Sequence, residues 1–260
     1  MRYAILFSGM SIRRHVNGLE FSYRTLVDSH GFATENIYVL NFDASLRACG
    51  DPEDAPCGLW PGDSTAHRMV VNAQGSRAAF QHALRAIGEK LTPDDQLFIN
   101  TMGHGGHHGD GRGPDLLTYP HCERYKRREF CADLAALPPH RSLVVLMAQC
   151  FAGGFNQAVI DASRAESTFI ASATSETRQS FMSFKDSNWD CFQRNWIAAL
   201  AGRDVDGASI DVIAGRGAAR GPITVHEAFT YASSCPGRSP FDSPEFAASP
   251  GGEGVTLSDE

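Results

Sequence analysis

The feature that most constrains the fold is a series of short apolar segments that alternate with helical patterns. Residues 142–148 (SLVVLMA) are apolar after the first position, which is typical of a parallel strand buried on both faces. Residues 96–102 (QLFINTM) are similar, and residues 75–91 between them carry apolar side chains at helical spacing. Alternating strands and helices predict an α/β protein with a mostly parallel sheet.

The alternation continues along the chain. Further strands are predicted at residues 3–7, 36–42 and 167–173, and further helices at residues 19–30, 128–137, 155–165, 189–201 and 225–233. The position of a final strand stays open. Residues 44–74 and 202–222 are rich in Gly, Pro, Asp and Ala, so we predict loop insertions there. No repeat or interdomain linker is visible, and we predict a single domain over residues 1–260 with about six strands.

Composition excludes several classes of protein. The chain has 260 residues, 42% of them hydrophobic, and a net charge of −7, so we expect no nucleic-acid partner. No apolar run approaches the roughly 20 residues of a membrane helix, and the amino-terminal run is too short for a signal peptide. We therefore expect a cytoplasmic protein without a membrane partner. Seven cysteines without a Cys-x-x-Cys pair suggest free thiols rather than a zinc ribbon.

Reactive side chains follow the two most apolar strands. His104 follows residues 96–102, Cys150 follows residues 142–148, and each lies in a Gly-rich turn. In an open parallel sheet, ligands bind beyond the carboxyl ends of the strands. A Cys–His pair supplies a nucleophile and its base, and a neighbouring imidazolium and a following helix favour the thiolate. The backbone N–H groups of Gly105 and Cys150 are candidate donors to an oxyanion.

These motifs resemble a known family. His104-Gly105 after one apolar strand and Ala148-Gln149-Cys150 after another are similar to the catalytic pattern of caspase-like (clan CD) cysteine peptidases. Three further segments resemble the legumain (asparaginyl endopeptidase) branch. They are Arg14-His15 ahead of Tyr23, the segment 172–177 (SATSET), and Asp186 shortly before Trp189.

The resemblance implies a three-layer caspase-like sandwich and an endopeptidase that cleaves after Asn, or Asp, through an acyl-enzyme. It implies no cofactor and no metal, and a peptide or protein substrate. Cys150, His104 and Gly105 are the implied catalytic residues. Arg14, His15, Ser172 and Asp186 are the implied substrate-binding residues, with Arg14 and Asp186 facing each other across the specificity pocket.

One departure from the legumain pattern leaves the specificity open. Legumains carry a Glu two residues before the catalytic cysteine, and this chain has Ala148 there. With Asp186 dominating the pocket, the same dyad would prefer Arg or Lys instead. Legumain relatives also transfer the acyl group to amines, so transpeptidase or ligase activity is a further alternative. The oligomeric state is not predicted.

Two other readings belong to different classes. His104, His107, His108 and Asp110 are ligand-type residues within seven positions, which suits a metal-dependent hydrolase, although the His-Glu-x-x-His spacing is absent. A caspase-like scaffold can also serve as a non-catalytic interaction protein, because fold alone does not establish activity.

Overall fold

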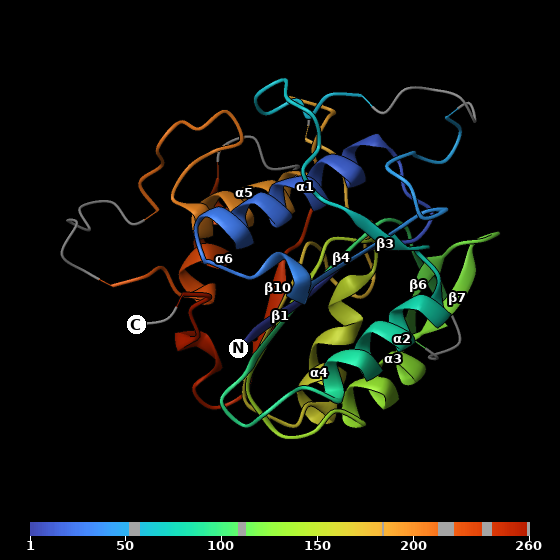
Figure 1. Cartoon of the computed structure of the whole chain (residues 1–260), viewed down its shortest axis with the longest axis vertical. Helices are drawn as coiled ribbons and strands as arrows, with labels where there is room; N and C mark the ends of the chain where they lie inside the picture. Colours follow the sequence, from blue (N-terminus) through green and yellow to red (C-terminus); the bar gives the residue numbers. More distant parts are fainter. Residues whose placement is uncertain (52–57, 109–112, 184, 213–220, 236–240, 259–260) are drawn as a thin grey trace.

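Two sheets organise the protein, which we describe from a computed structural model. The structure describes residues 1–51, 58–108, 113–183, 185–212, 221–235 and 241–258. A seven-stranded sheet has the order β10-β9-β8-β4-β1-β2-β3, and a separate three-stranded sheet has the order β5-β6-β7 (Figure 1). The strands are β1 (Arg2–Ser8), β2 (Ile37–Asn41), β3 (Val71–Ala73), β4 (Gln96–Met102), β5 (Gly105–His108), β6 (Gly113–Thr118), β7 (Glu123–Lys126), β8 (His140–Met147), β9 (Ala165–Ser172) and β10 (Glu245–Ala248).

Helices cover both faces of the large sheet. The α-helices are α1 (Arg13–Asp28), α2 (Arg77–Gly88), α3 (Arg127–Ala135), α4 (Asn156–Ala162), α5 (Cys191–Ala201) and α6 (Val225–Ser234). Apolar side chains of α1, α5 and α6 pack in one hydrophobic cluster, and those of α2, α3 and α4 pack in a second. Figure 1 shows the two helical layers on opposite sides of the sheet. The predicted three-layer α/β sandwich is confirmed.

The central strands are buried on both faces, as their apolar sequences predict. In β8, Val144 and Leu146 belong to the cluster under α1, whereas Leu143, Val145 and Met147 belong to the cluster under α2. Successive side chains of a strand point to opposite faces, so a strand between two helical layers needs apolar residues at every position. All pairs in the large sheet are parallel except β9 with β10, which are antiparallel.

The large sheet has seven strands rather than about six. The short strand β3 lies within the segment 44–74 that was predicted to be a loop, and β10 supplies the final strand. Helix α1 begins at Arg13 rather than at residue 19, because its first turn is polar and lacks the apolar spacing used to find helices.

The small sheet β5-β6-β7 was not predicted. Strand β5 occupies the start of the Gly-rich segment that was interpreted as a turn. Glycine has a low intrinsic strand propensity, so a Gly-rich strand is specified by its partners rather than by its own sequence. Here β5 pairs with β6, from Gly105 opposite Leu116 to His108 opposite Gly113.

Two expectations from composition concern membrane-spanning helices and the state of the cysteines. Within the described residues, no helix is both long and apolar enough to span a bilayer. Six of the seven cysteines are described, and all six are free thiols: Cys49, Cys122, Cys131, Cys150, Cys191 and Cys235. Cys57 lies outside the described residues.

Candidate active site

The turns that carry His104 and Cys150 touch each other at the carboxyl edge of the large sheet. Strands β4 and β8 are parallel neighbours, so the segments that follow them begin side by side. Gly103 turns the chain after β4 with a φ of +119°, a conformation that glycine tolerates best. A Cβ added to Gly105 would lie 2.1 Å from the carbonyl oxygen of Cys150, so only glycine fits this contact. The structure therefore brings together His104, Gly105 and Cys150.

Buried hydrogen bonds link the two turns beneath the reactive residues. The Thr101 hydroxyl donates to Oε1 of Gln149 over 2.8 Å, and both side chains are fully buried. The N–H of Ala148 also donates to the carbonyl oxygen of Thr101 over 2.9 Å. These bonds hold the residue before Cys150 against the strand that leads to His104. Nothing in the sequence indicated that Thr101 and Gln149 form a hydrogen-bonded pair.

Cys150 lies in a sharp turn with few contacts to its sulfur. The residue after it, Phe151, has a φ of 63°, a left-handed conformation that is uncommon for a residue with a side chain. The N–H of Phe151 donates to the carbonyl oxygen of Arg178 over 2.8 Å, which holds the turn. The half-buried Cys150 sulfur lies 3.8 Å from the hydroxyl of Ser180 and 3.9 Å from its carbonyl oxygen.

The helix after Cys150 begins within one residue of its predicted start at residue 155, but this start is not close to Cys150. A 3₁₀ turn over Ala152–Phe155 comes first, and α4 begins at Asn156 and has only seven residues. The effect of a helix dipole falls off within the first turn. The expected contribution of the helix to thiolate formation is therefore not supported by this geometry.

His104 lies beside a second histidine. The rings of His104 and His15 meet edge to face, with their centroids 5.5 Å apart. His104 is exposed at its outer side, but partial desolvation and, secondarily, the positive charge of Arg14 lower its pKa below the ordinary value. The lowered pKa favours the neutral imidazole at neutral pH, the form that accepts a proton.

His15 is fully buried and also neutral. Its Nδ1 accepts a hydrogen bond from the N–H of Ile12 over 3.2 Å, so the ring proton is assigned to Nε2. Nε2 faces a carboxylate oxygen of Asp190 at 3.6 Å. Burial, followed by the charges of Arg14 and His104, lowers the pKa of His15 well below its ordinary value.

Asp190 is the carboxylate that Arg14 contacts. Nε of Arg14 donates to Asp190 over 2.7 Å. Asp190 occupies the N-cap position of α5, yet its side chain makes no capping hydrogen bond and is turned to Arg14 instead. Burial raises the pKa of Asp190, and the charge of Arg14 acts against that rise. Arg14, His15, Asp190 and His104 thus form one connected polar cluster next to Cys150.

Two predicted substrate-binding residues do not lie where they were expected. The carboxylate of Asp186 accepts a hydrogen bond from the N–H of Asn188 over 3.0 Å and helps to raise the pKa of Arg194. The carboxylate that Arg14 contacts in the structure is Asp190, whereas the sequence had predicted Asp186 as its partner. Ser172 is fully buried, and its hydroxyl donates to Oδ1 of Asn156 over 2.6 Å, so this hydroxyl is not available to a substrate.

The metal reading gains no support from the part of the chain that the structure describes. No group of three or more His, Cys, Asp or Glu side chains suited to a metal ion occurs there. His107 is exposed, and its ring lies tilted against that of Phe151, with the centroids 5.2 Å apart. Asp110 and the side chain of His108 lie outside the described residues.

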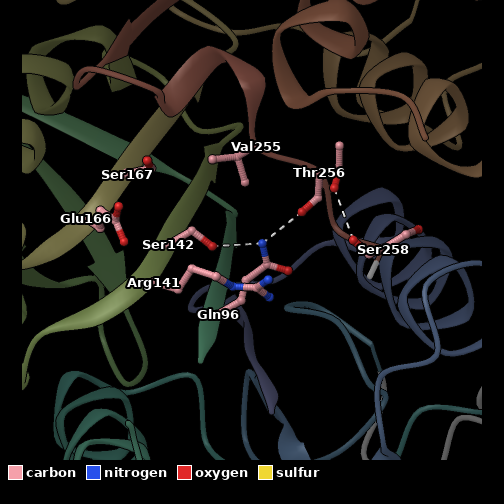
Figure 2. Close-up of a pocket in the computed structure, with 8 residues that line it drawn as sticks. All are labelled: Gln96, Arg141, Ser142, Glu166, Ser167, Val255, Thr256 and Ser258. Atoms are coloured by element: carbon pink, nitrogen blue, oxygen red, sulfur yellow. Dashed lines mark hydrogen bonds between the residues drawn. The ribbon is translucent and has the colours of Figure 1, made fainter. Parts of the chain in front are cut away.

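A pocket lies at the opposite edge of the sheet, where β4, β8 and β9 begin (Figure 2). It has a volume of about 400 Å³ and is lined by Gln96, Arg141, Ser142, Glu166, Ser167, Val255, Thr256 and Ser258. Nε2 of Gln96 donates to the Ser142 hydroxyl and to the carbonyl oxygen of Thr256, each over 2.9 Å. These bonds fasten the carboxyl-terminal segment to the sheet, so we assign a structural role to this pocket.

Three comparisons place the chain among known proteins. The model of the peptidase C13 family matches residues 65–211, a span that includes His104, Cys150 and Asp190. No curated protein matches the chain. Among solved structures, a structural genomics target from Geobacter sulfurreducens matches with a TM-score of 0.56 and 13% identity, covering 95% of this chain and 92% of that one. At this identity, the likeness concerns the fold alone.

Proposed function

The chain belongs to the peptidase C13 family of legumain-type cysteine peptidases, and we propose that it is an endopeptidase that works through Cys150 and His104. The observation that carries this proposal is the contact between the two turns. Gly105, next to His104, packs directly on the carbonyl group of Cys150. The two candidate residues belong to adjoining backbone segments that a buried hydrogen bond holds together, which supports their proposed roles as nucleophile and base.

The proposed reaction uses neutral His104 as the base. His104 removes the proton from the Cys150 thiol as the sulfur attacks the peptide carbonyl carbon. The negative charge that develops on the carbonyl oxygen is stabilised by the backbone N–H groups of Gly105 and Cys150. His104 then gives its proton to the leaving amine, and water releases the acyl group. If an amine takes the place of water, the same acyl-enzyme yields a new peptide bond, which is the ligase alternative.

We place the specificity pocket at Arg14 and Asp190. A guanidinium donor and a carboxylate acceptor together match the carbonyl oxygen and the NH₂ group of an Asn side chain. A substrate Asp is accepted at lower pH, when Asp190 carries a proton. Burial raises the pKa of Asp190, so this protonation occurs closer to neutral pH. Because Ala148 stands where legumains carry a Glu, cleavage after Arg or Lys is the rival specificity.

A digest of a peptide library, read by mass spectrometry, tests this function. We expect the purified protein to cut peptides after Asn, and at lower pH after Asp, with no added metal. Cys150→Ala should abolish cleavage, because losing a nucleophile costs at least about 10⁴-fold in rate. Cys122→Ala, which removes an exposed cysteine, is the matched control. Equal cleavage by wild type and Cys150→Ala would refute the proposal, and cutting after Arg or Lys would overturn only the specificity.

A further inference from the structure

An apolar patch adjoins the candidate nucleophile. It consists of Phe181, Met182 and Phe241, and we call it the apolar patch. The rings of Phe181 and Phe241 pack together with their centroids 5.5 Å apart. Phe241 is 56% exposed and Met182 is 43% exposed, so two of the six large apolar side chains that stand out as exposed in the described structure belong to this one patch. The packing of Phe241 on Phe181 next to a reactive site, with Met182 adjoining in the chain, indicates a binding surface rather than scattered exposure.

The patch is tied to both ends of the candidate site. Ser180, the residue before Phe181, contacts the Cys150 sulfur through its hydroxyl and its carbonyl oxygen, at 3.8 and 3.9 Å. Met182 forms an antiparallel bridge with Asp190, the acid that holds Arg14. The segment 180–182 therefore runs from the nucleophile to the proposed specificity pocket.

The patch is also held in place by a polar contact. The N–H of Phe181 donates to the carboxylate of Asp242 over 3.0 Å, and Asp242 is buried. This bond joins the segment that follows β9 to the segment that precedes β10 and fixes the two rings relative to each other. A preformed apolar surface costs little further ordering when a ligand binds.

The sheet order shows which part of a substrate reaches the patch. Strand β8, which precedes Cys150, lies between β4 and β9. His104 follows β4, whereas the patch segment follows β9, so the two flank Cys150 from opposite sides. His104 must meet the leaving amine, which places the carboxyl-terminal part of the substrate on its side. The amino-terminal part then extends over the segment 180–182.

We propose that the apolar patch binds the substrate side chain immediately before the residue held by Arg14 and Asp190, and that it selects an aromatic or branched aliphatic residue there. Phe181 follows by one position the residue that contacts the nucleophile, and an extended peptide advances about 3.3 Å per residue, so the neighbouring substrate residue is in reach. The proposal rests on the proposed peptidase function and adds a second specificity element to it.

Fluorogenic peptides test the proposal. In every peptide, the residue immediately before the scissile bond is the one that the library digest shows to be preferred. The position preceding that residue is varied and holds Phe, Leu, Gly or Glu. We expect kcat/KM to be at least about tenfold higher for Phe or Leu than for Gly or Glu, the usual size of discrimination by an apolar pocket. Phe241→Ala should reduce this preference several-fold. Val70→Ala truncates a side chain that is 70% exposed and lies just before β3, the last strand of the sheet. This variant should leave the preference for Phe or Leu unchanged.

A binding assay separates this proposal from the proposed function. The same four peptides are titrated against the Cys150→Ala protein, and Phe and Leu should bind about tenfold more tightly than Gly and Glu. Thermal melting checks that Phe241→Ala is folded. Selective binding without turnover by the wild type would refute the peptidase function and keep the subsite. No selectivity in either assay, or an unchanged preference in folded Phe241→Ala, would overturn the subsite.

Discussion

Polar side chains at the two edges of the central sheet, where the strands begin and where they end, differ in how they are hydrogen-bonded. At the edge shown in Figure 2, the Gln96 amide donates two hydrogen bonds of 2.9 Å, to Ser142 and Thr256. At the opposite edge, the polar contacts of the Cys150 sulfur within the described residues are two long ones to Ser180, of 3.8 and 3.9 Å. Groups that hold the fold are locked by short hydrogen bonds, whereas the groups proposed to react keep their bonding capacity for a substrate.

Beneath the reactive edge, however, lies a pair of buried, hydrogen-bonded side chains that we call the locked layer. Directly below Cys150 and His104, the buried pair Thr101 and Gln149 is joined by a hydrogen bond of 2.8 Å. A catalytic pair must be held within a fraction of an ångström of its productive geometry, and neighbouring hydrogen bonds supply that restraint. The polar groups at the two edges are thus of three kinds: reactive ones, those that position the reactive ones, and those that only fasten the fold.

Removing a reactive group should have the largest effect. His104→Ala should lower kcat for the best peptide substrate by roughly 10²–10⁴-fold, the range for lost general acid–base catalysis. The matched control is His107→Ala, which alters an exposed histidine of the same segment and should change kcat by less than about threefold. A similar loss in both variants, restored by added zinc, would favour the metal reading.

The pH profile sharpens the same point. Since burial and Arg14 lower the pKa of His104, the neutral base persists to lower pH than for a free imidazole. kcat/KM should therefore rise with pH through a midpoint below 6.5, the ordinary value for histidine. A midpoint above 6.5 would contradict this environment for His104.

Altering the specificity pocket should have the next largest effect. Asp190→Asn removes the carboxylate that Arg14 contacts and should lower kcat/KM for Asn peptides by roughly 10–100-fold, the usual cost of a lost charged hydrogen bond. Asp186→Asn is the matched control and should stay within about twofold. Assays with Asn, Asp, Arg and Lys peptides measure both variants. A larger loss in Asp186→Asn would restore the assignment made from the sequence.

Removing a positioning group should have a smaller effect. Thr101→Val keeps the shape of the side chain but loses the hydroxyl that donates to Gln149, and should lower kcat about tenfold with little change in KM. Thr101→Ser retains the hydroxyl and should keep most of the activity. Steady-state kinetics separate kcat from KM. An unchanged kcat in folded Thr101→Val would show that the locked layer does not position the dyad.

Altering the opposite edge should affect stability alone. Gln96→Leu leaves the Ser142 hydroxyl and the Thr256 carbonyl without their donor and should lower the free energy of unfolding by roughly 1–3 kcal/mol. kcat/KM should stay within about twofold of the wild type. Denaturant unfolding and peptide assays of the same preparation measure the two quantities. Loss of activity without loss of stability would give this edge a role in catalysis.

Sequence patterns predicted the α/β fold with its mostly parallel sheet because strands buried on both faces must be largely apolar, as residues 143–148 are. They missed β5, since its Gly-rich sequence acquires strand structure only through pairing with β6. The approach of Gly105 to Cys150 is likewise a three-dimensional contact that only glycine permits, and the sequence showed just the residue type.

The specificity residues were harder to predict, for two physical reasons. Asp190 fell inside the helix predicted over residues 189–201, whereas in the structure it precedes α5 and its carboxylate accepts from Arg14 instead of capping the helix. Ser172 lies two residues after Ile170 in β9, so both side chains point to the same face of the sheet, where Ile170 packs in the cluster under α4. Arg14 belongs to α1, which covers the other face. Strand alternation was the available signal that Ser172 points away from the pocket.

Trapping the acyl-enzyme tests the central claim most directly. A good peptide substrate is mixed with the protein, the reaction is quenched with acid within the first turnover, and the adduct is located by peptide mapping. We predict a mass increase equal to the amino-terminal half of the substrate, located on Cys150 and absent from Cys150→Ala. Peptide cleavage at an undiminished rate in Cys150→Ala, or an adduct on another residue, would contradict the account.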